Sequence, residues 1–311
     1  MKRIAAIDIG SNSILLLIAE VQGRRLPRPI IGRKETPRLS AGMKETGIIG
    51  NDAVVSLLRS LKSFKRVCEN EGVDELRCYA TSALRSASNS GELLGRVKRE
   101  TGFDINTISG RREAALTYLG AVTGLSNLNR YRLLVDAGGG SSEIVFADRR
   151  RIISSDSFLI GSVRLTEQFR SGRRLTESEM DRTLEAIGSE VSKLPLPDIR
   201  RPLTLICSGG TPTAIQGYRV GLDAYDPSRV HDATMRISEY KSLVYELGMM
   251  TLASRRRALR FEPKRADVIT SGGLLTVAFA EQSGAGFVRI SDRSLRFGML
   301  CEMVGRAPEF A

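Results

Sequence analysis

Leu134-Val-Asp-Ala-Gly-Gly-Gly-Ser-Ser-Glu-Ile-Val-Phe146 is the stretch of sequence that decides the fold. An apolar run ends at Asp136, three glycines and two serines follow, and a second apolar run begins at Ile144, which predicts a strand, a turn and a strand. Three glycines without side chains let backbone N–H groups close around an anion, flanked by Asp136 and Glu143. The stretch therefore predicts either a cradle for phosphate and metal or a plain glycine-rich hairpin.

The amino terminus repeats this plan. Ile4-Ala-Ala-Ile-Asp-Ile-Gly-Ser-Asn-Ser13 leads into a second apolar run, and its Asp8 precedes Asp136 by 128 residues (136 − 8). A supersecondary unit that recurs at this spacing indicates two similar domains. We therefore expect an α/β fold with two lobes around a central cleft, to which each lobe offers one of these turns.

Two helices carry clear local signals. Apolar residues recur every three or four positions from Val54 to Cys68, which predicts a helix with one buried face. Thr176 and Glu179 have the spacing of a capping box, which predicts that a helix begins there.

Composition indicates an ordinary globular protein. The 311 residues, 41% hydrophobic and 26% charged, suffice for two domains of roughly 150 residues each. No apolar run approaches the ~20 residues of a membrane span, and Asp8 comes too early for a signal sequence. We expect a cytoplasmic protein without a membrane partner. The cysteines are too scattered for a zinc site or a disulfide framework and are expected to be reduced and buried: Cys68, Cys78, Cys207 and Cys301.

The charge balance favours anionic partners. A net charge of +12 and a pI near 9.9 attract polyanions, among which nucleic acid and inorganic polyphosphate both qualify. Aromatic residues make up only 5% and are not interleaved with the basic runs, so no specific nucleic-acid partner is expected. A single histidine, His231, argues against a Ser/His/Asp triad and against a histidine-ligated metal, and we expect it in a loop.

Placed on one cleft, the polar groups form a set suited to phosphoryl transfer. Asp136, Glu143 and Asp8 are hard oxygen ligands for Mg²⁺ or another divalent cation. Arg85, after a predicted strand, is placed to clamp a departing phosphate, and Glu113, in the first turn of a predicted helix, is the candidate base for an attacking water. The candidate phosphate-binding residues are Ser11, Asn12, Ser13, Gly138, Gly139, Gly140, Ser141, Ser142, Ser208 and Gly209.

Seven motifs resemble, in order and spacing, those of the exopolyphosphatase / guanosine pentaphosphate phosphohydrolase (Ppx/GppA) family, in its short two-domain form. The resemblance spans the chain from residue 4 to about residue 304. The motifs are Asp8-Ile-Gly-Ser-Asn-Ser13, Ala80-Thr-Ser-Ala-Leu-Arg85, Ser109-Gly-Arg-Arg-Glu-Ala114, Val135-Asp-Ala-Gly-Gly-Gly-Ser-Ser-Glu143, Gly161-Ser-Val-Arg-Leu-Thr-Glu167, Ser208-Gly-Gly-Thr211 and Leu295-Arg-Phe-Gly298.

The resemblance implies two ribonuclease-H-like lobes of the actin, hexokinase and heat-shock-chaperone superfamily. It implies hydrolysis of a terminal phosphoanhydride bond, with release of orthophosphate from polyphosphate or from guanosine pentaphosphate. Glu113 matches the family's catalytic base, Arg85 its phosphate-clamping arginine, and Asp136 and Glu143 its metal-binding and active-site acids.

The expected domains are residues 1–127 and 128–297, with a carboxyl-terminal helix at about 298–311 that packs back on the first lobe. Two departures from the family pattern affect the site. Arg111 and Arg112 raise the positive charge beside the proposed base, and Phe297 stands where relatives often carry an acid.

The predicted function is that of an exopolyphosphatase, which releases orthophosphate from the end of polyphosphate by attack of a water that Glu113 activates. Two alternatives stay open: a guanosine pentaphosphate 5′-phosphohydrolase in the same site, and a catalytically silent sensor that binds polyphosphate or the alarmone. A kinase of the same superfamily is disfavoured, and a homodimer is neither favoured nor excluded.

Overall fold

The structure is a computed structural model that describes residues 1–23, 25–149, 151–196 and 202–306. Contacts divide the chain into two compact units. The first comprises Met1–Gly120 together with the described residues from Leu295 on, and the second comprises Ala121–Ser294. Each unit is built on one mixed sheet, with helices on its faces.

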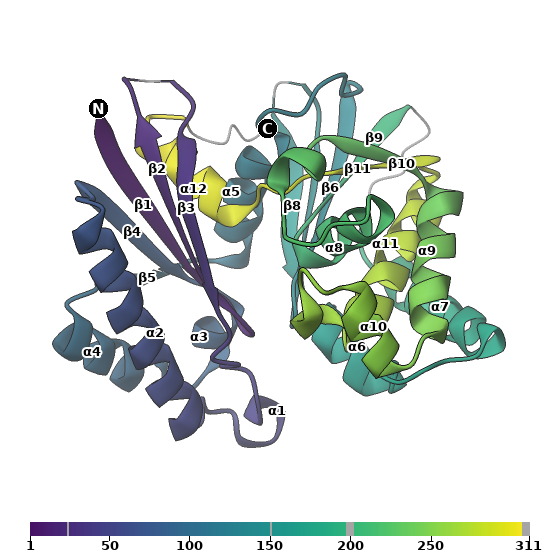
Figure 1. The fold of residues 1–311 in the computed structure, drawn as a ribbon, viewed down its shortest axis with the longest axis horizontal. Coiled ribbons are helices and arrows are strands. Elements are labelled where there is room, and N and C mark those ends of the chain that lie inside the picture. The colour runs from purple at the N-terminus through teal and green to yellow at the C-terminus, as the bar shows by residue number, and fades with distance from the viewer. Residues whose placement is uncertain (24, 150, 197–201, 307–311) are drawn as a thin grey trace. The chain divides into compact units, whose positions relative to one another are not determined.

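The first sheet has the strand order β3-β2-β1-β4-β5 (Figure 1). Its β1 is antiparallel to β2 and parallel to β4, so the amino-terminal strand lies at the centre. The strands are β1 (Lys2–Ile9), β2 (Ile14–Val21), β3 (Arg28–Glu35), β4 (Glu75–Ala80) and β5 (Ile105–Thr107).

Helices cover both faces of this sheet. Side chains of β1 alternate between the two faces, so this strand contributes to a core on each side. Ala5, Ile7 and Ile9 join the core beneath α2 and α4, whereas Ile4 and Ala6 join the core beneath α5 and α12. The helices of the first unit are α1 (Met43–Thr46), α2 (Asn51–Asn70), α3 (Ser82–Ser86), α4 (Ser90–Thr101), α5 (Gly110–Val122) and α12 (Leu295–Met303). The predicted apolar face of α2 is confirmed, since its residues from Val54 to Cys68 at that spacing are buried.

The second sheet repeats the topology of the first. Its order is β10-β11-β9-β6-β7-β8, in which β8-β7-β6-β9-β11 reproduces the first sheet with the same parallel and antiparallel pairs, and β10 adds an edge strand. The strands are β6 (Tyr131–Ala137), β7 (Ser142–Ala147), β8 (Ile152–Phe158), β9 (Leu203–Ser208), β10 (Ala233–Arg236) and β11 (Phe287–Ile290). The predicted repeat therefore extends beyond the hairpin to a whole five-stranded sheet.

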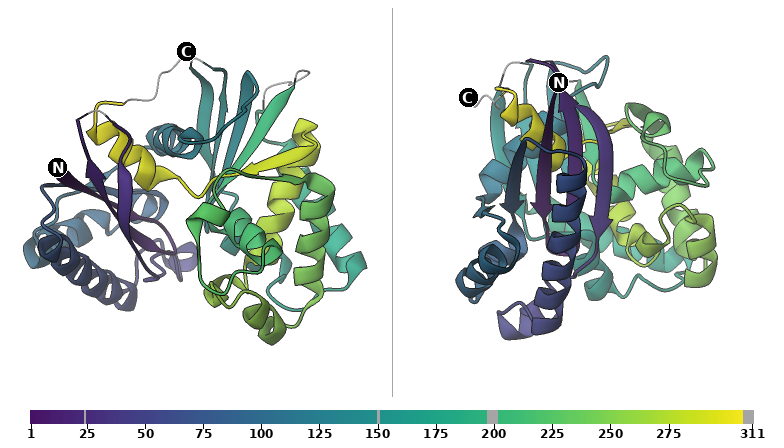
Figure 2. Two further views of the ribbon diagram at one scale, coloured as in Figure 1. Left: turned by 45° about the horizontal axis from the view of Figure 1, so that its top comes forward. Right: turned by 60° about the vertical axis from the view of Figure 1, so that its left-hand side comes forward.

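A helical layer built around α11 packs on the second sheet (Figure 2). The buried α11 carries Gly272 and Gly273, where an added Cβ would lie 2.4 Å from Thr211 Oγ1 and 2.5 Å from Val244 Cγ2. These glycines thus allow α8 and α9 to approach the α11 backbone. The helices are α6 (Ser162–Phe169), α7 (Glu177–Ser192), α8 (Gly210–Arg219), α9 (Ile237–Met249), α10 (Leu252–Ala258) and α11 (Ile269–Ser283), with 3₁₀ turns η1 (Pro227–Arg229) and η2 (Pro263–Arg265).

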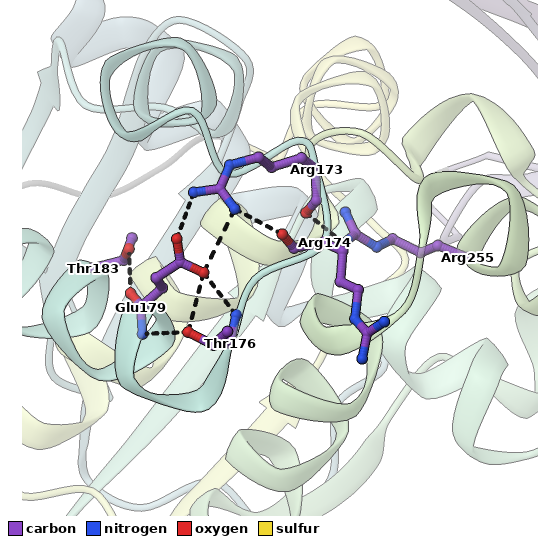
Figure 3. A network of polar contacts seen from close by, with 6 residues as sticks. All are labelled: Arg173, Arg174, Thr176, Glu179, Thr183 and Arg255. Atoms are coloured by element: carbon purple, nitrogen blue, oxygen red, sulfur yellow. Dashed lines mark hydrogen bonds and ion pairs between the residues drawn. The ribbon is translucent and has the colours of Figure 1, made fainter.

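The capping box that begins α7 is confirmed. The Thr176 hydroxyl accepts from the Glu179 N–H, and the Glu179 carboxylate accepts from the Thr176 N–H at 2.8 Å. Arg173 donates to the same carboxylate at 2.6 Å (Figure 3). Together these bonds lower the pKa of Glu179 to about 2, with the Arg173 bond as the largest cause.

Arg255 on α10 is fully buried and is held by carbonyl groups rather than by a carboxylate. Its guanidinium donates to the carbonyls of Leu247 at 2.7 Å, Ala266 at 2.8 Å and Arg173 at 3.0 Å, the last drawn in Figure 3. Burial lowers the pKa of this guanidinium to about 10. Arg255 therefore binds the end of α9 to the segments before α7 and before α11.

The unit boundaries differ from those expected. The sequence places the first boundary at residue 127, whereas the contacts divide the chain at residue 120, inside α5. The last helix begins at Leu295, three residues earlier than expected, and ends at Met303, because Gly305 follows in a left-handed conformation (φ +81°). The expected extension over residues 307–311 lies outside the described residues. The described part of this helix packs on the first unit, as expected.

The four cysteines are buried free thiols, as expected. Within the described ranges, no helix is long and apolar enough to span a bilayer.

Candidate active site

The two Asp-led turns have the same local geometry. In the first, the Gly10 N–H donates to the Ser13 carbonyl at 3.0 Å, and a Cβ on Gly10 would lie 3.2 Å from that oxygen. In the second, a Cβ on Gly138 would lie 2.8 Å from the Ser141 carbonyl oxygen. A side chain at Gly138 would therefore clash with the chain three residues later, and a side chain at Gly10 would be crowded at the matching position.

The glycine turn of the second unit directs two successive N–H groups away from the protein behind it. The Gly138 carbonyl accepts from the Ser162 N–H, and the Gly139 carbonyl accepts from the Val163 N–H, each at 2.9 Å. Because a trans peptide unit points its N–H opposite to its carbonyl, the N–H groups of Gly139 and Gly140 face away from α6. Adjacent N–H groups in such an arrangement form an anion-binding concavity.

The serine turn of the first unit repeats this device. The Ser11 carbonyl accepts from the Ser40 N–H, and the Asn12 carbonyl accepts from the Arg38 N–H, each at 3.0 Å. The N–H groups of Asn12 and Ser13 therefore face away from that loop. Each unit thus holds one turn with a pair of outward N–H groups, at positions that the sequence assigned to phosphate.

Four polar side chains form one row across the second sheet. The strand registers pair Asp136 with both Ser208 and Glu143, and Glu143 with Ser157. Register partners project from the same face, and this face is opposite the Val135 side that packs in the helical core. Glu143 is buried, and its Oε1 accepts from Ser157 Oγ at 2.8 Å and from Ser141 Oγ at 3.2 Å.

The row continues into the turn that begins α8. Gly209 has φ +88°, and a Cβ there would lie 2.5 Å from Asp136 Oδ1, so the glycine leaves room for the carboxylate. Ser208 Oγ is buried and has no hydrogen-bond partner within the described chain. The structure thus brings together Asp136, Glu143, Ser208 and Gly209, as the sequence predicted.

Arg265 belongs to the same locality and was missed by the sequence reasoning. Its guanidinium lies where a Cβ on Gly210 would stand, at the start of α8, and its Nε lies 3.1 Å from Glu262 Oε1. No local pattern in the sequence links Arg265 to Gly210. A cation over a helix amino terminus reinforces an anion site.

Arg85 and Glu113 meet in the first unit. Arg85 Nη1 donates to Glu113 Oε2 and to the Ile108 carbonyl, each at 3.0 Å. Glu113 lies in the first turn of α5 and is only 6% exposed, whereas the Arg85 side chain is 28% exposed. A buried carboxylate is therefore paired with a cation that is still open to solvent.

Asp8 lies on the same face of the first sheet as α5. It is half-buried and is two residues from Ala6, which packs against α5 and α12, so its side chain shares that face. Its strand partners are Leu15 and Tyr79. Asp8, Arg85 and Glu113 are thus supplied by the first unit, and Asp136 and Glu143 by the second.

Arg112 does not act as an isolated charge beside Glu113. Its guanidinium pairs with Glu302 of α12, whose carboxylate also accepts from Arg77 at 3.0 Å and from the Tyr79 hydroxyl at 3.2 Å. This cluster fixes α12 on the first unit. The positive charge that the sequence places at Arg112, beside the proposed base, is therefore balanced by Glu302, a residue 190 positions away. Phe297 is buried within α12.

Comparisons with known proteins identify the family. Residues 17–307 match the model of the Ppx/GppA phosphatase family. The chain is 28% identical over 331 residues to exopolyphosphatase 2 of Mycobacterium tuberculosis, covering 98% of this chain and 99% of that protein. It is also 28% identical over 310 residues to the bifunctional 3-dehydroquinate synthase/phosphatase of Fusobacterium nucleatum; this covers 96% of the chain but only 46% of that longer protein.

Solved structures show the same fold. The crystal structure of the Aquifex aeolicus Ppx/GppA family member matches with a TM-score of 0.83 at 31% identity, covering 97% of both chains. An exopolyphosphatase from Cytophaga hutchinsonii matches with a TM-score of 0.82 at 26% identity, covering 97% of this chain and 98% of that one. The expected fold class, α/β with two lobes of the actin and hexokinase type, is confirmed. The chain belongs to the Ppx/GppA phosphatase family and is a phosphoanhydride hydrolase.

Proposed function

We propose that the protein is an exopolyphosphatase, which hydrolyses the terminal phosphoanhydride bond of inorganic polyphosphate and releases orthophosphate. The observation that carries the proposal is the buried Glu113 carboxylate paired at 3.0 Å with the partly exposed Arg85. The basic net charge of +12 favours a polyanionic substrate, and the name of the Mycobacterium tuberculosis relative agrees with it.

In this proposal Glu113 is the general base. A water oxygen attacks the terminal phosphorus, its proton passes to a Glu113 carboxylate oxygen, and the bond from that phosphorus to the bridging oxygen breaks. The products are orthophosphate and a chain shorter by one phosphate. Arg85 holds the ionised carboxylate through Nη1, and the remaining donors of its planar guanidinium are suited to a phosphate oxygen.

The outward N–H pair of each turn is proposed to bind phosphate. The donors are those predicted from the sequence: Ser11, Asn12, Ser13, Gly138, Gly139, Gly140, Ser141, Ser142, Ser208 and Gly209. We add Arg265 to them, because its guanidinium lies against Gly210 at the amino terminus of α8.

Two acids of the second unit are proposed to hold a divalent cation, and the described residues contain no group of three or more His, Cys, Asp or Glu side chains placed to hold one. Asp136 and Glu143 are register partners with hard oxygen donors, which suit Mg²⁺ when water completes the coordination. Asp8 is the third proposed acid. The ion would supply charge neutralisation to the phosphate oxygens.

The test compares two substrates with purified protein and Mg²⁺. We expect a higher kcat/KM for orthophosphate release from long-chain polyphosphate than from guanosine pentaphosphate. The reverse order would identify a guanosine pentaphosphate phosphohydrolase using the same residues. Tight binding of either compound without turnover would contradict the proposed activity and would indicate a sensor. The expected cytoplasmic location stays a prediction.

A further inference from the structure

A basic groove on the first unit is lined by residues of α2 and α4, two helices that lie side by side in Figure 1. It encloses a hollow of about 380 Å³. Its lining consists of Val55, Leu58, Arg59, Lys62, Ser63, Arg66, Arg96 and Glu100, so four cations face one carboxylate. Neither Glu113 nor Arg85 lines it.

Helix geometry aligns the cations of α2. Arg59, Lys62 and Arg66 are spaced by three and four residues, so they form one stripe along the exposed side of the helix. The stripe is roughly 10 Å long, at about 1.5 Å of rise per residue. Such a row of cations fits an extended anion that carries charge at regular intervals.

Glu100 organises one part of the groove and leaves two cations for a ligand. Its carboxylate accepts from Lys62 at 2.8 Å and from Arg96 at 2.9 Å, and these two bonds, that from Lys62 first, lower the pKa of Glu100. Within the part of the chain that the structure describes, Arg59 and Arg66 make no ion pair with any carboxylate. Both are exposed guanidinium groups, whose planar forks match phosphate oxygens.

We infer that this groove is a second binding site for an inorganic polyphosphate chain, separate from the residues proposed for hydrolysis. The chemistry of the lining selects the occupant. No aromatic side chain lines the groove, so it lacks the stacking platform that single-stranded nucleic acid uses. A chain of bare phosphates needs only the cations and the Ser63 hydroxyl. The inference rests on the proposed function, because the bound chain is the proposed substrate.

A chain held in the groove raises the effective concentration of its own ends at the enzyme. Long polymers therefore gain apparent affinity, whereas tripolyphosphate, which is too short to use both sites, gains none. The groove thereby gives the enzyme a preference for long chains through KM rather than through kcat.

The experiment uses the double variant Arg59→Gln/Arg66→Gln. The matched control is Arg256→Gln/Arg257→Gln, which removes the same charge from exposed positions on α10. Binding of long-chain polyphosphate is measured in a Glu113→Gln background, where hydrolysis is slow. We expect the groove variant to bind roughly tenfold more weakly, since each exposed ion pair contributes a factor of about two to five. The slope of log Kd against log salt should fall by roughly 1.4, for two lost phosphate contacts at about 0.7 each.

Steady-state hydrolysis, in the background with Glu113 intact, supplies the second readout. We expect a raised KM for long chains, an unchanged kcat, and unchanged kinetics with tripolyphosphate. An equal loss of binding in the control variant would show that the weaker binding follows from the lower net charge alone, and it would overturn the inference. Poly(U) that binds the groove as tightly as polyphosphate would assign it to nucleic acid instead. If the wild-type protein does not hydrolyse polyphosphate but the groove variant still loses binding, the proposed function fails and the groove stands as a binding site.

Discussion

Replacing Arg255 by methionine tests the account of the second unit most severely. The guanidinium serves five carbonyls: Leu247 at 2.7 Å, Ala266 at 2.8 Å, Arg173 at 3.0 Å, Gly248 at 3.1 Å and Met250 at 3.3 Å. Methionine fills the volume but donates to none of them. A buried acceptor left without a partner costs about 1–3 kcal/mol, and relaxation and water entry reduce the sum for neighbouring groups. We therefore expect a loss of about 3–5 kcal/mol, from several buried acceptors that each lose a partner.

The assay is urea unfolding of the intact protein, followed by far-UV circular dichroism and by an independent probe of the second unit, because two units do not guarantee a two-state transition. Arg255→Lys keeps the charge but has only three donors, so we expect an intermediate loss. Arg256→Met, at the exposed neighbouring position, should change stability by less than about 0.5 kcal/mol.

The prediction extends to activity. Ala266, one of the five acceptors, follows Arg265, whose guanidinium lies against Gly210. Arg255→Met should therefore weaken substrate binding as well as stability. A variant as stable as the wild type would refute the reasoning, because it would mean that the five carbonyls find other partners at no net loss.

Two further predictions concern local geometry. The pKa of Glu179 is lowered to about 2, so the contribution of its carboxylate to folding stability is present above the ordinary value of 4.5 and is lost as pH falls through about 2. Glu179→Gln should therefore flatten the pH dependence of stability between those two values. An unchanged pH dependence in acid unfolding would count against the capping network. Gly298→Ala should destabilise the protein by about 1–3 kcal/mol, because its Cβ would lie 1.8 Å from the Leu116 carbonyl oxygen on α5. The matched Gly188→Ala, in open space on α7, should stabilise by about 0.5–1 kcal/mol, and thermal melts in which both variants behave alike would contradict the packing argument.

Sequence predicted the parts of the fold that depend on neighbouring residues. The Asp8 and Asp136 turns recur because an acid, a glycine in a crowded position and small polar residues favour the same hairpin twice. The start of α7 follows from the reciprocal hydrogen bonds between Thr176 and Glu179, which are three residues apart. The buried face of α2 follows from helical periodicity. Local chemistry therefore sufficed for the repeat and for the candidate residues at the turns.

Contacts between residues that are far apart in the sequence could not be predicted from it. Arg112 and Glu302 are 190 residues apart, and the sequence around either residue does not indicate that they pair. Arg255 stands in the run Arg255-Arg256-Arg257, and it is the one of these three arginines whose side chain is buried. Such partners are chosen by how helices pack, which composition and spacing do not encode locally. The roles of Glu113, Asp136 and the other proposed site residues stay predictions.

Glu113 is the residue on which the proposed chemistry depends, and one measurement addresses it directly. Orthophosphate release from polyphosphate under single-turnover conditions is compared for the wild type and Glu113→Gln, with polyphosphate binding measured in parallel. Glutamine keeps the size of the side chain and an acceptor for Arg85 but cannot take the proton of water. We predict that hydrolysis slows by about 10²- to 10⁴-fold while binding is retained. Hydrolysis at the wild-type rate in Glu113→Gln would contradict the account.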